Sequence, residues 1–264
     1  MSKLRVFIQL HLLMDSRAFA LKDKLSYLAF HDTILGESDQ DIKACYKYNP
    51  PGDTSGGLPE HSDAIQVEQE MYAAENRRWS RAFEPLYRAA LHKMDEPDSL
   101  KVFLLKIHST SLVVRLAGIL SGSELVYDNF MHEFGQIVSL SKTVLNHPQS
   151  DNLFAAGSFS FDIGIIYPLL AVSYACRDRE LRREAIALLE SKSWREAQWG
   201  SNPSVHVSKF LMQVEEEGID GDFIPEWARA RLTGIEVNTE TGQARVRCVR
   251  GTGESAVSRY SVWH

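Results

Sequence analysis

The stretch over residues 159–190 constrains the fold more than any other part of the chain, because it joins a nearly all-apolar segment directly to a charged amphipathic one. Apolar residues occupy almost every position over 163–175, a run too short for the ~20 residues that cross a membrane. This run therefore predicts a helix buried on all sides. Over 179–190 the apolar residues recur with the period of a helix, so the stretch predicts an antiparallel helix pair.

The charged half of this stretch is amphipathic. Its apolar stripe lies at positions i, i+4, i+7 and i+8 and consists of Leu181, Ala185, Leu188 and Leu189. We expect the charged side chains outside the stripe, such as Arg182 and Arg183, to face solvent. Residues 177–184 carry four basic and three acidic side chains. This balance favours a solvated helix start with internal ion pairs over a phosphate or partner site.

The composition is that of a folded protein rather than a disordered one. With 264 residues, 44% of them hydrophobic, the chain has enough apolar surface for one large helical domain. Its formal net charge of −6 gives no global attraction to nucleic acid. We therefore expect no direct nucleic-acid binding by this chain alone, and no membrane association.

The cysteines and histidines give no sign of a metal site. Cys45, Cys176 and Cys248 are too widely separated for a zinc ligand set, and position 136 lacks the second histidine of a zinc-protease motif. An odd number of cysteines argues against a secreted disulfide framework, so we expect an intracellular protein of the nucleus or cytoplasm. Cys176 follows an apolar helix, where core packing is favoured over redox reactivity. No cofactor or metal is expected.

Helical patterns cover most of the chain. Beyond an amphipathic segment at the N-terminus, the expected helices lie at 17–35, 63–94, 102–120, 123–144, 163–175, 179–190 and 202–217, with a flexible loop over 48–62. Pro85 is expected to kink or divide the helix over 63–94. Ser123 is expected to cap the helix over 123–144. The prediction is an all-α single domain over 1–250, with stacked antiparallel helix pairs in the manner of an α-solenoid.

The segment 234–250 predicts a β-hairpin that closes this domain. Val246 and Cys248 alternate with Arg245 and Arg247, which is the period of a strand with one solvent-exposed face. We assign Arg250 to the same face as these two arginines. A solvent-facing strand is favoured, and contact with DNA phosphates or a partner is the alternative. Residues 251–264 are expected to form a loose tail.

Several motifs in order along the chain resemble one protein family. They are SELVYDNF at 123–130, FSFDIGIIYP at 159–168, CRDRELRREAIALL at 176–189, WREAQW at 194–199, and IPEWAR at 224–229 followed by the hairpin. Together they resemble the C-terminal regulatory domain of fungal zinc-cluster transcription factors, a helical family that includes sterol-responsive regulators. The cysteine-rich zinc cluster of that family has no counterpart here, since no Cys-x-x-Cys occurs.

The resemblance implies an all-helical effector or dimerisation domain that controls genes, often those of secondary metabolism. It implies a homodimer, or a heterodimer with full-length zinc-cluster factors, and an apolar small molecule as effector. Two other functions stay open: an enzyme or apolar-metabolite-binding protein of secondary metabolism on the same scaffold, and a dominant-negative partner of full-length factors.

Two sets of residues are candidates for a site. The apolar pocket implied for sterol-responsive regulators would be lined by Phe103, Phe130, Phe134, Phe161, Ile166 and Tyr167, although plain core packing is favoured for such side chains. Asp162 enters an apolar segment, where an acid caps a helix, pairs with a cation, or acts in acid–base chemistry. Helix capping is favoured, which leaves Asp162 as a weak catalytic candidate.

Overall fold

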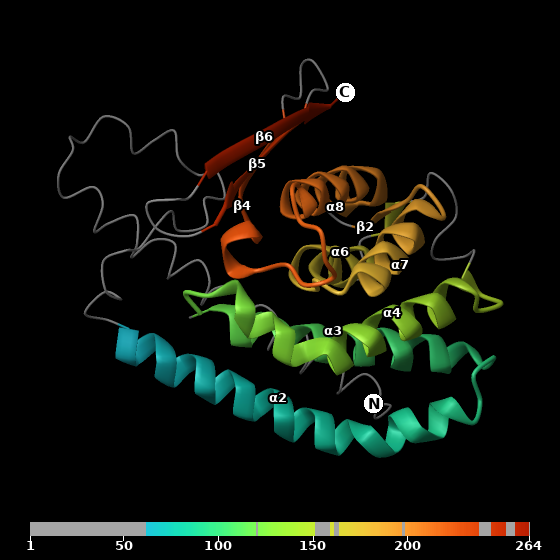
Figure 1. Ribbon diagram of the computed structural model, residues 1–264. Helices are drawn as coiled ribbons and strands as arrows, with labels where there is room; N and C mark the ends of the chain where they lie inside the picture. The colour runs from blue at the N-terminus through green and yellow to red at the C-terminus, as the bar shows by residue number, and fades with distance from the viewer. Residues whose placement is uncertain are drawn as a thin grey trace, which may run out of the picture.

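The computed structural model describes residues 62–119, 121–150, 159–160, 164–196, 199–237, 244–251 and 257–263. Within these ranges the chain is mostly helical, with a small antiparallel sheet near the C-terminal end (Figure 1). The helices predicted N-terminal to residue 48, and all but the last residue of the predicted loop, lie outside the described residues.

The helices and strands follow one another along the chain as follows. The α-helices are α2 (Ser62–Leu91), α3 (Pro97–Ile119), α4 (Met131–Leu145), α6 (Ile166–Ala175), α7 (Arg179–Glu190) and α8 (Ser201–Glu216). Two short 3₁₀ helices are η2 (Glu124–Phe130) and η3 (Glu226–Ala228). The strands are β1 (Phe159–Ser160), β2 (Arg195–Glu196), β3 (Trp199–Gly200), β4 (Ala230–Val237), β5 (Ala244–Arg250) and β6 (Val257–Trp263).

The helices lie in successive layers that follow chain order. In Figure 1, α2 lies along one side, α3 and α4 lie next to it, and α6 and α7 follow on the side away from α2. α8 packs on α6 and α7, and the sheet of β4, β5 and β6 contacts α8. Most packing partners are therefore close in sequence.

α3 is the central helix of the hydrophobic core. It contacts α2, α4 and α6, and its residues Phe103, Ile107 and Leu112 are at most 1% exposed. By length and composition alone, α3 is apolar enough to span a membrane. Most of its apolar stretch is buried inside the domain, however, so its hydrophobicity is used for packing against the neighbouring helices.

The two helices predicted over 163–190 are found as α6 and α7, which pack against each other. α7 has the predicted bounds, and Asp178 caps it by accepting a hydrogen bond from the amide of Leu181. α6 is buried on nearly every side, with only Tyr167 and Tyr174 partly exposed. It begins at Ile166 rather than at 163.

α2 and η2 differ in detail from the prediction. Pro85 does not divide α2, which continues as one helix to Leu91, and Figure 1 shows this helix bending along its length. Ser123 is a cap, as predicted, because its side chain accepts a hydrogen bond from the amide of Leu125. The segment that it caps is the 3₁₀ helix η2, and the α-helix α4 follows only at Met131.

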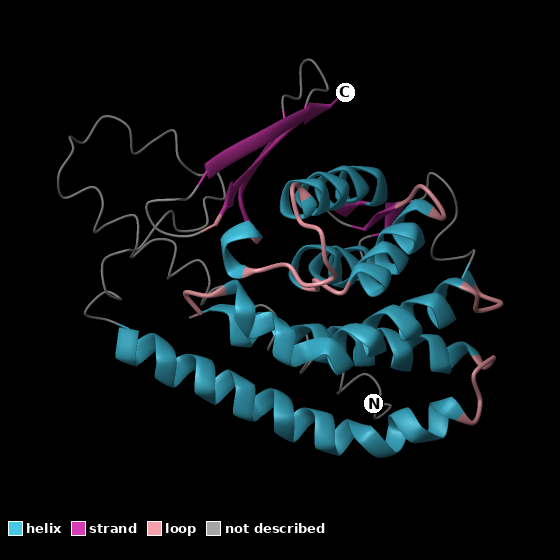
Figure 2. Ribbon diagram, viewed as in Figure 1, coloured by secondary structure: helices cyan, strands magenta, loops and turns pink. Residues whose placement is uncertain are grey.

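The C-terminal hairpin is one strand larger than predicted. β4 pairs with β5 in antiparallel fashion as expected, and β5 pairs in turn with β6, from Ala244 opposite Trp263 to Arg250 opposite Val257. The prediction of a loose tail is therefore wrong for residues 257–263. This segment is rich in valine and aromatic residues, which favour strands, and it completes the sheet in Figure 2.

Candidate functional site

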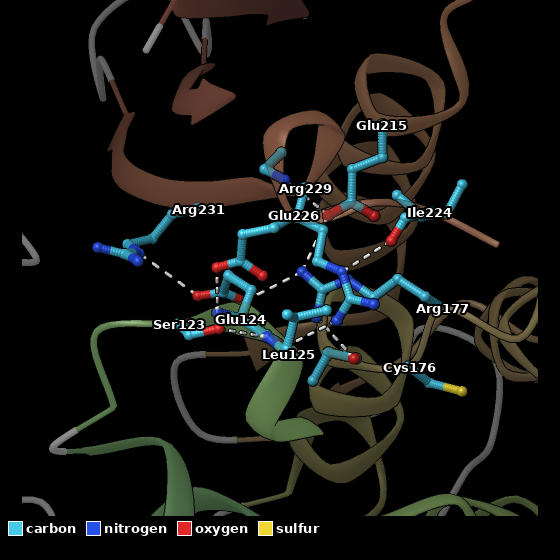
Figure 3. A network of polar contacts seen from close by, with 12 residues as sticks. Ser123, Glu124, Leu125, Cys176, Arg177, Glu215, Ile224, Glu226, Arg229 and Arg231 are labelled. Atoms are coloured by element: carbon cyan, nitrogen blue, oxygen red, sulfur yellow. Dashed lines mark hydrogen bonds and ion pairs between the residues drawn. The ribbon is translucent and has the colours of Figure 1, made fainter. Parts of the chain in front are cut away.

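A buried carboxylate on α8 joins the helices to the sheet (Figure 3). Glu215 is completely buried. Its Oε1 accepts hydrogen bonds from Nη2 of Arg177 at 2.9 Å and from the backbone amide of Ala230 at 2.7 Å. Its Oε2 accepts a hydrogen bond from Nη2 of Arg182. One side chain thus links the turn before α7, α7 itself and the first residue of β4.

Each of the two arginines also donates to a carbonyl group of the same turn. Arg177 Nη1 donates to Ala175 O at 2.7 Å, and Arg182 Nε donates to Cys176 O at 2.8 Å. Both guanidinium groups are buried together with Glu215. The contacts hold the sharp connection between α6 and α7 in one conformation.

The electrostatics of this cluster keep it ionised. Burial alone would raise the pKa of Glu215, but Arg177 and Arg182 hold that pKa below its usual value. Burial would lower the pKa of Arg177, but Glu215 and Glu124 raise it instead. Glu215 is fully buried and both of its oxygens already accept hydrogen bonds, so the cluster stabilises the structure and is closed to a substrate.

A third buried arginine attaches the sheet to η2. Arg229, directly before β4, donates two hydrogen bonds to the carboxylate of Asp128, at 2.8 and 2.6 Å. It also donates to the carbonyl oxygens of Ile224 and Glu124, each at 2.9 Å. Arg231 adds an ion pair with the Glu124 carboxylate at 3.3 Å. Every charged nitrogen of Arg229 is used, so the start of β4 is fixed to the helical body.

These contacts correct the prediction that residues 177–184 form a solvated helix start. Arg183 is exposed as predicted, but Arg177 and Arg182 are buried. The physical reason is that their acidic partner comes from α8, more than 30 residues later in the sequence. The run of three glutamates over 215–217 is the only signal in the sequence, and it does not tell which of the three faces inward.

A second buried carboxylate holds the start of α6. Glu196 accepts hydrogen bonds from the backbone amides of Ile165 and Ile166, at 3.0 and 2.9 Å, and from Trp194 Nε1 at 2.7 Å. Burial raises the pKa of Glu196 despite these donors. Because this side chain binds the first amides of α6, the helix needs no cap from its own end. Asp162, the predicted cap and weak catalytic candidate, lies outside the described residues.

The fit between Glu196 and Gly164 gives a testable expectation. A methyl group on Gly164 would overlap the Glu196 carboxylate, which is fixed by its three hydrogen bonds. We expect Gly164→Ala to lower the free energy of unfolding by about 1–3 kcal/mol. Gly135, inside α4, has open space around it. The control Gly135→Ala should therefore stabilise the protein by about 0.5–1 kcal/mol. Urea unfolding of both variants measures the two effects, and equal signs would contradict this packing.

The residues predicted to line an apolar pocket are found in or beside the hydrophobic core. Phe103, Phe134 and Ile166 are at most 1% exposed, and Phe130 packs against the same core cluster from its edge. Tyr167 is partly exposed and lies under the guanidinium of Arg115, whose carbon is 5.2 Å from the ring centre. Phe161 lies outside the described residues. Core packing, the favoured interpretation, accounts for the buried three; their use as an apolar ligand pocket stays a prediction.

The two described cysteines are buried free thiols. Burial raises the pKa of Cys176 to about 11 and that of Cys248 to about 12, so both stay protonated at neutral pH. Core packing is thus confirmed for Cys176. Within the described ranges, no group of three or more histidine, cysteine, aspartate or glutamate side chains is placed to hold a metal ion.

The sheet has one face on α8 and one face away from it. Val246 and Cys248 are buried against α8, while Arg245 and Arg247 are exposed, as the alternation predicted. The assignment of Arg250 to this exposed face is wrong. An odd number of steps separates it from the other two arginines, so it points to the opposite side. There it donates to the carbonyl oxygens of residues 217 and 228.

Among the described residues, β6 is an outer strand of this sheet, since the strand order is β4, β5, β6. Tyr260 is 70% exposed and lies opposite Arg247, with the Arg245 guanidinium 5.7 Å from its ring centre. Val257 and Val262 of the same strand are also exposed. Arg259 is the one charged residue in the strand. Exposed aromatic and arginine side chains on a sheet edge are typical of a protein–protein interface.

The comparisons with known proteins add no relative. No protein-family model, curated protein or solved structure matches this chain.

Proposed function

We propose that this chain is a regulatory domain of the kind found at the C-terminus of fungal zinc-cluster transcription factors, and that it acts through dimerisation. The support from sequence is the ordered set of motifs over 123–229. The support from structure is that these motifs meet in buried polar contacts. Arg177 and Arg229 both bind Glu124, and Glu196 binds the amides of Ile165 and Ile166. Their polar groups build a scaffold instead of a reaction centre.

The observation that carries the dimer proposal is the outer edge of β6. An outer strand offers unpaired backbone N–H and C=O groups, and proteins normally protect such edges with prolines, several charges or a covering segment. β6 has seven residues without proline or glycine and with a single charge. Its side chains Tyr260 and Val262 are exposed to 70% and 38%. A strand from another chain is the natural cover for such an edge.

A second copy of the same chain fits this edge. In an antiparallel pair centred on Tyr260, residue 258 faces residue 262 of the other copy and residue 259 faces residue 261. Arg259 then lies opposite Ser261, so that no like charges are paired, and the two Tyr260 rings lie side by side on the outer face. The two sheets become one continuous six-stranded sheet across the two-fold axis. The buried arginine contacts give each sheet a fixed orientation for this pairing.

The remaining expectations from the resemblance belong to this proposal. The domain acts in the nucleus, in control of a metabolic gene cluster, and a full-length zinc-cluster factor with the same edge strand is an alternative dimer partner. The layered helices are units of a stacked, solenoid-like domain. No feature of the described residues favours the competing function, an enzyme or an apolar-metabolite-binding protein.

The dimer proposal predicts a change of mass in solution. Wild-type protein at high micromolar concentration should elute with a light-scattering mass of twice the monomer mass of 29.9 kDa. Tyr260→Lys places two positive charges at the two-fold axis and should give the monomer. Because Tyr260 is mostly exposed, the thermal stability of the variant should stay within about 3 °C of wild type.

Two controls separate this effect from a general change of surface charge. Val67→Lys introduces the same charge at an exposed apolar position on α2, 65% exposed, and should remain dimeric. Tyr260→Phe preserves the ring and should also remain dimeric. A wild-type protein that stays monomeric at high concentration, or a Tyr260→Lys variant that stays dimeric, would rule out pairing through β6.

A further inference from the structure

A pocket of about 360 Å³ opens between α2, α3 and α4, on the opposite side of the domain from the sheet. Its volume is within the range of small-molecule sites. α3 supplies the floor with polar residues of its otherwise apolar sequence, and α2 and α4 supply the walls. None of the residues predicted to line an apolar pocket contributes to it. Ten of its eleven lining residues are polar or charged.

The deepest polar group of this pocket has an unused acceptor. Asn76, on α2, is 1% exposed and lines the pocket. Its Nδ2 donates to the carbonyl oxygen of Ser109 at 3.1 Å. That bond fixes the orientation of the amide, because only the NH₂ group can donate. Its Oδ1 is buried and has no hydrogen-bond partner among the described residues. A buried acceptor of this kind is stabilised by a ligand that brings a hydroxyl or amine donor.

The pocket is also positively charged. Arg77, Arg81 and Lys106 line it, with Glu133 as the single acidic residue of the lining. Lys106 is partly balanced by Glu84, at 3.9 Å. Arg77 and Arg81 form no ion pair with any residue in the described part of the chain, and both are exposed at the rim. This local charge is the reverse of the chain's net charge of −6. Guanidinium groups with free donors are suited to phosphate or carboxylate groups.

We infer that this pocket binds a small phosphorylated polyol, with its phosphate between Arg77 and Arg81 and a hydroxyl donating to Asn76 Oδ1. The arginines at the rim are suited to the anionic end of the ligand, and the unpartnered amide oxygen of Asn76 is suited to its hydroxyl. Thr110 and Gln136 already bond to each other at 2.9 Å and complete the polar wall. The site is independent of the β6 edge, so it does not rest on the dimer proposal.

The test uses glycerol 3-phosphate as the probe in isothermal titration calorimetry with the full chain. We expect binding to one site per chain, and no binding of uncharged glycerol. The double variant Arg77→Gln, Arg81→Gln should weaken binding by about tenfold or more. Arg78→Gln is the matched control, because Arg78 is exposed on the same helix but does not line the pocket. It should change the affinity less than twofold.

The hydroxyl contact is tested with a second probe. Ethyl phosphate has the same charged group but no free hydroxyl. It should bind at least about fivefold more weakly than glycerol 3-phosphate. The proposal is overturned if glycerol 3-phosphate fails to bind at millimolar concentration, if Arg78→Gln weakens binding as much as the double variant, or if both phosphates bind equally well. The Tyr260→Lys variant should bind the probe as tightly as wild type, which separates this result from the oligomeric state.

Discussion

Replacement of Glu215 by glutamine is expected to lower the free energy of unfolding by about 3–5 kcal/mol. The carboxylate is the shared partner of Arg177 and Arg182, which are 4% and 1% exposed at their side chains. Removal of its charge leaves two buried guanidinium groups with incomplete compensation. The NH₂ group of glutamine also places a hydrogen-bond donor where the carboxylate had an accepting oxygen, and this donor faces the donors of the arginines. The loss should appear as a fall in Tm of roughly 10 °C in thermal unfolding.

A neighbouring glutamate is the control for this experiment. Glu216 pairs with Arg183 at 2.6 Å, but the arginine is 47% exposed. A partly exposed ion pair contributes less than about 1 kcal/mol, so Glu216→Gln should have a small effect. If Glu215→Gln is no more destabilising than Glu216→Gln, the buried arginine contacts do not hold the sheet and helices together as described.

The same carboxylate should make the stability of the protein depend on pH. The folded pKa of Glu215 is lowered, so its contribution is fully present above the pKa of an unfolded glutamate, about 4.3. It is lost as the pH falls from there through the lowered folded pKa. The difference in unfolding free energy between wild type and Glu215→Gln should therefore shrink in acid. A difference that is constant from neutral pH to pH 3 would contradict this linkage.

Ile166→Asp is expected to abolish the cooperative fold or to destabilise it by about 4 kcal/mol or more. Ile166 is completely buried at the first turn of α6 and belongs to the main core cluster. Its amide is already bound to the Glu196 carboxylate, so a new carboxylate there would be close to an existing acid. Circular dichroism during heating should show an early or absent transition.

The conservative change Ile166→Val serves as its control. It removes one methylene group from the same site and should cost about 0.5–1.5 kcal/mol. A variant with aspartate that unfolds within a few degrees of wild type would show that position 166 is accessible to water, against its burial in the core.

The elements that the sequence predicted well are those that depend on neighbours along the chain. The bounds of α7 follow from the spacing of Ala185 and Leu189, which are both buried. The alternation of Val246 and Cys248 with exposed arginines predicts which face of β5 is inward. A helix or strand repeats its environment every few residues, so its period is visible without any knowledge of the fold.

The strand β6 and the partners of buried charges could not be predicted in this way. Residues 257–263 become a strand because β5 supplies the hydrogen-bonding partner, and the period of the tail alone does not identify one. The same limit holds for the polar pocket, whose lining comes from three helices. Contacts of this kind depend on the positions of elements that are far apart in sequence.

The segment over 159–190 shows both what the local sequence predicts and what only tertiary contacts decide. Its sequence alone determined that it forms a buried helix joined to an amphipathic one, because apolar density and helical period are local properties of the chain. Only the tertiary structure decided that Arg177 and Arg182 turn inward and that Glu196 holds the first amides of α6. A buried charge requires a partner of opposite sign or a set of donors. Here those partners, Glu215 and Glu196, come from later segments that only folding brings near.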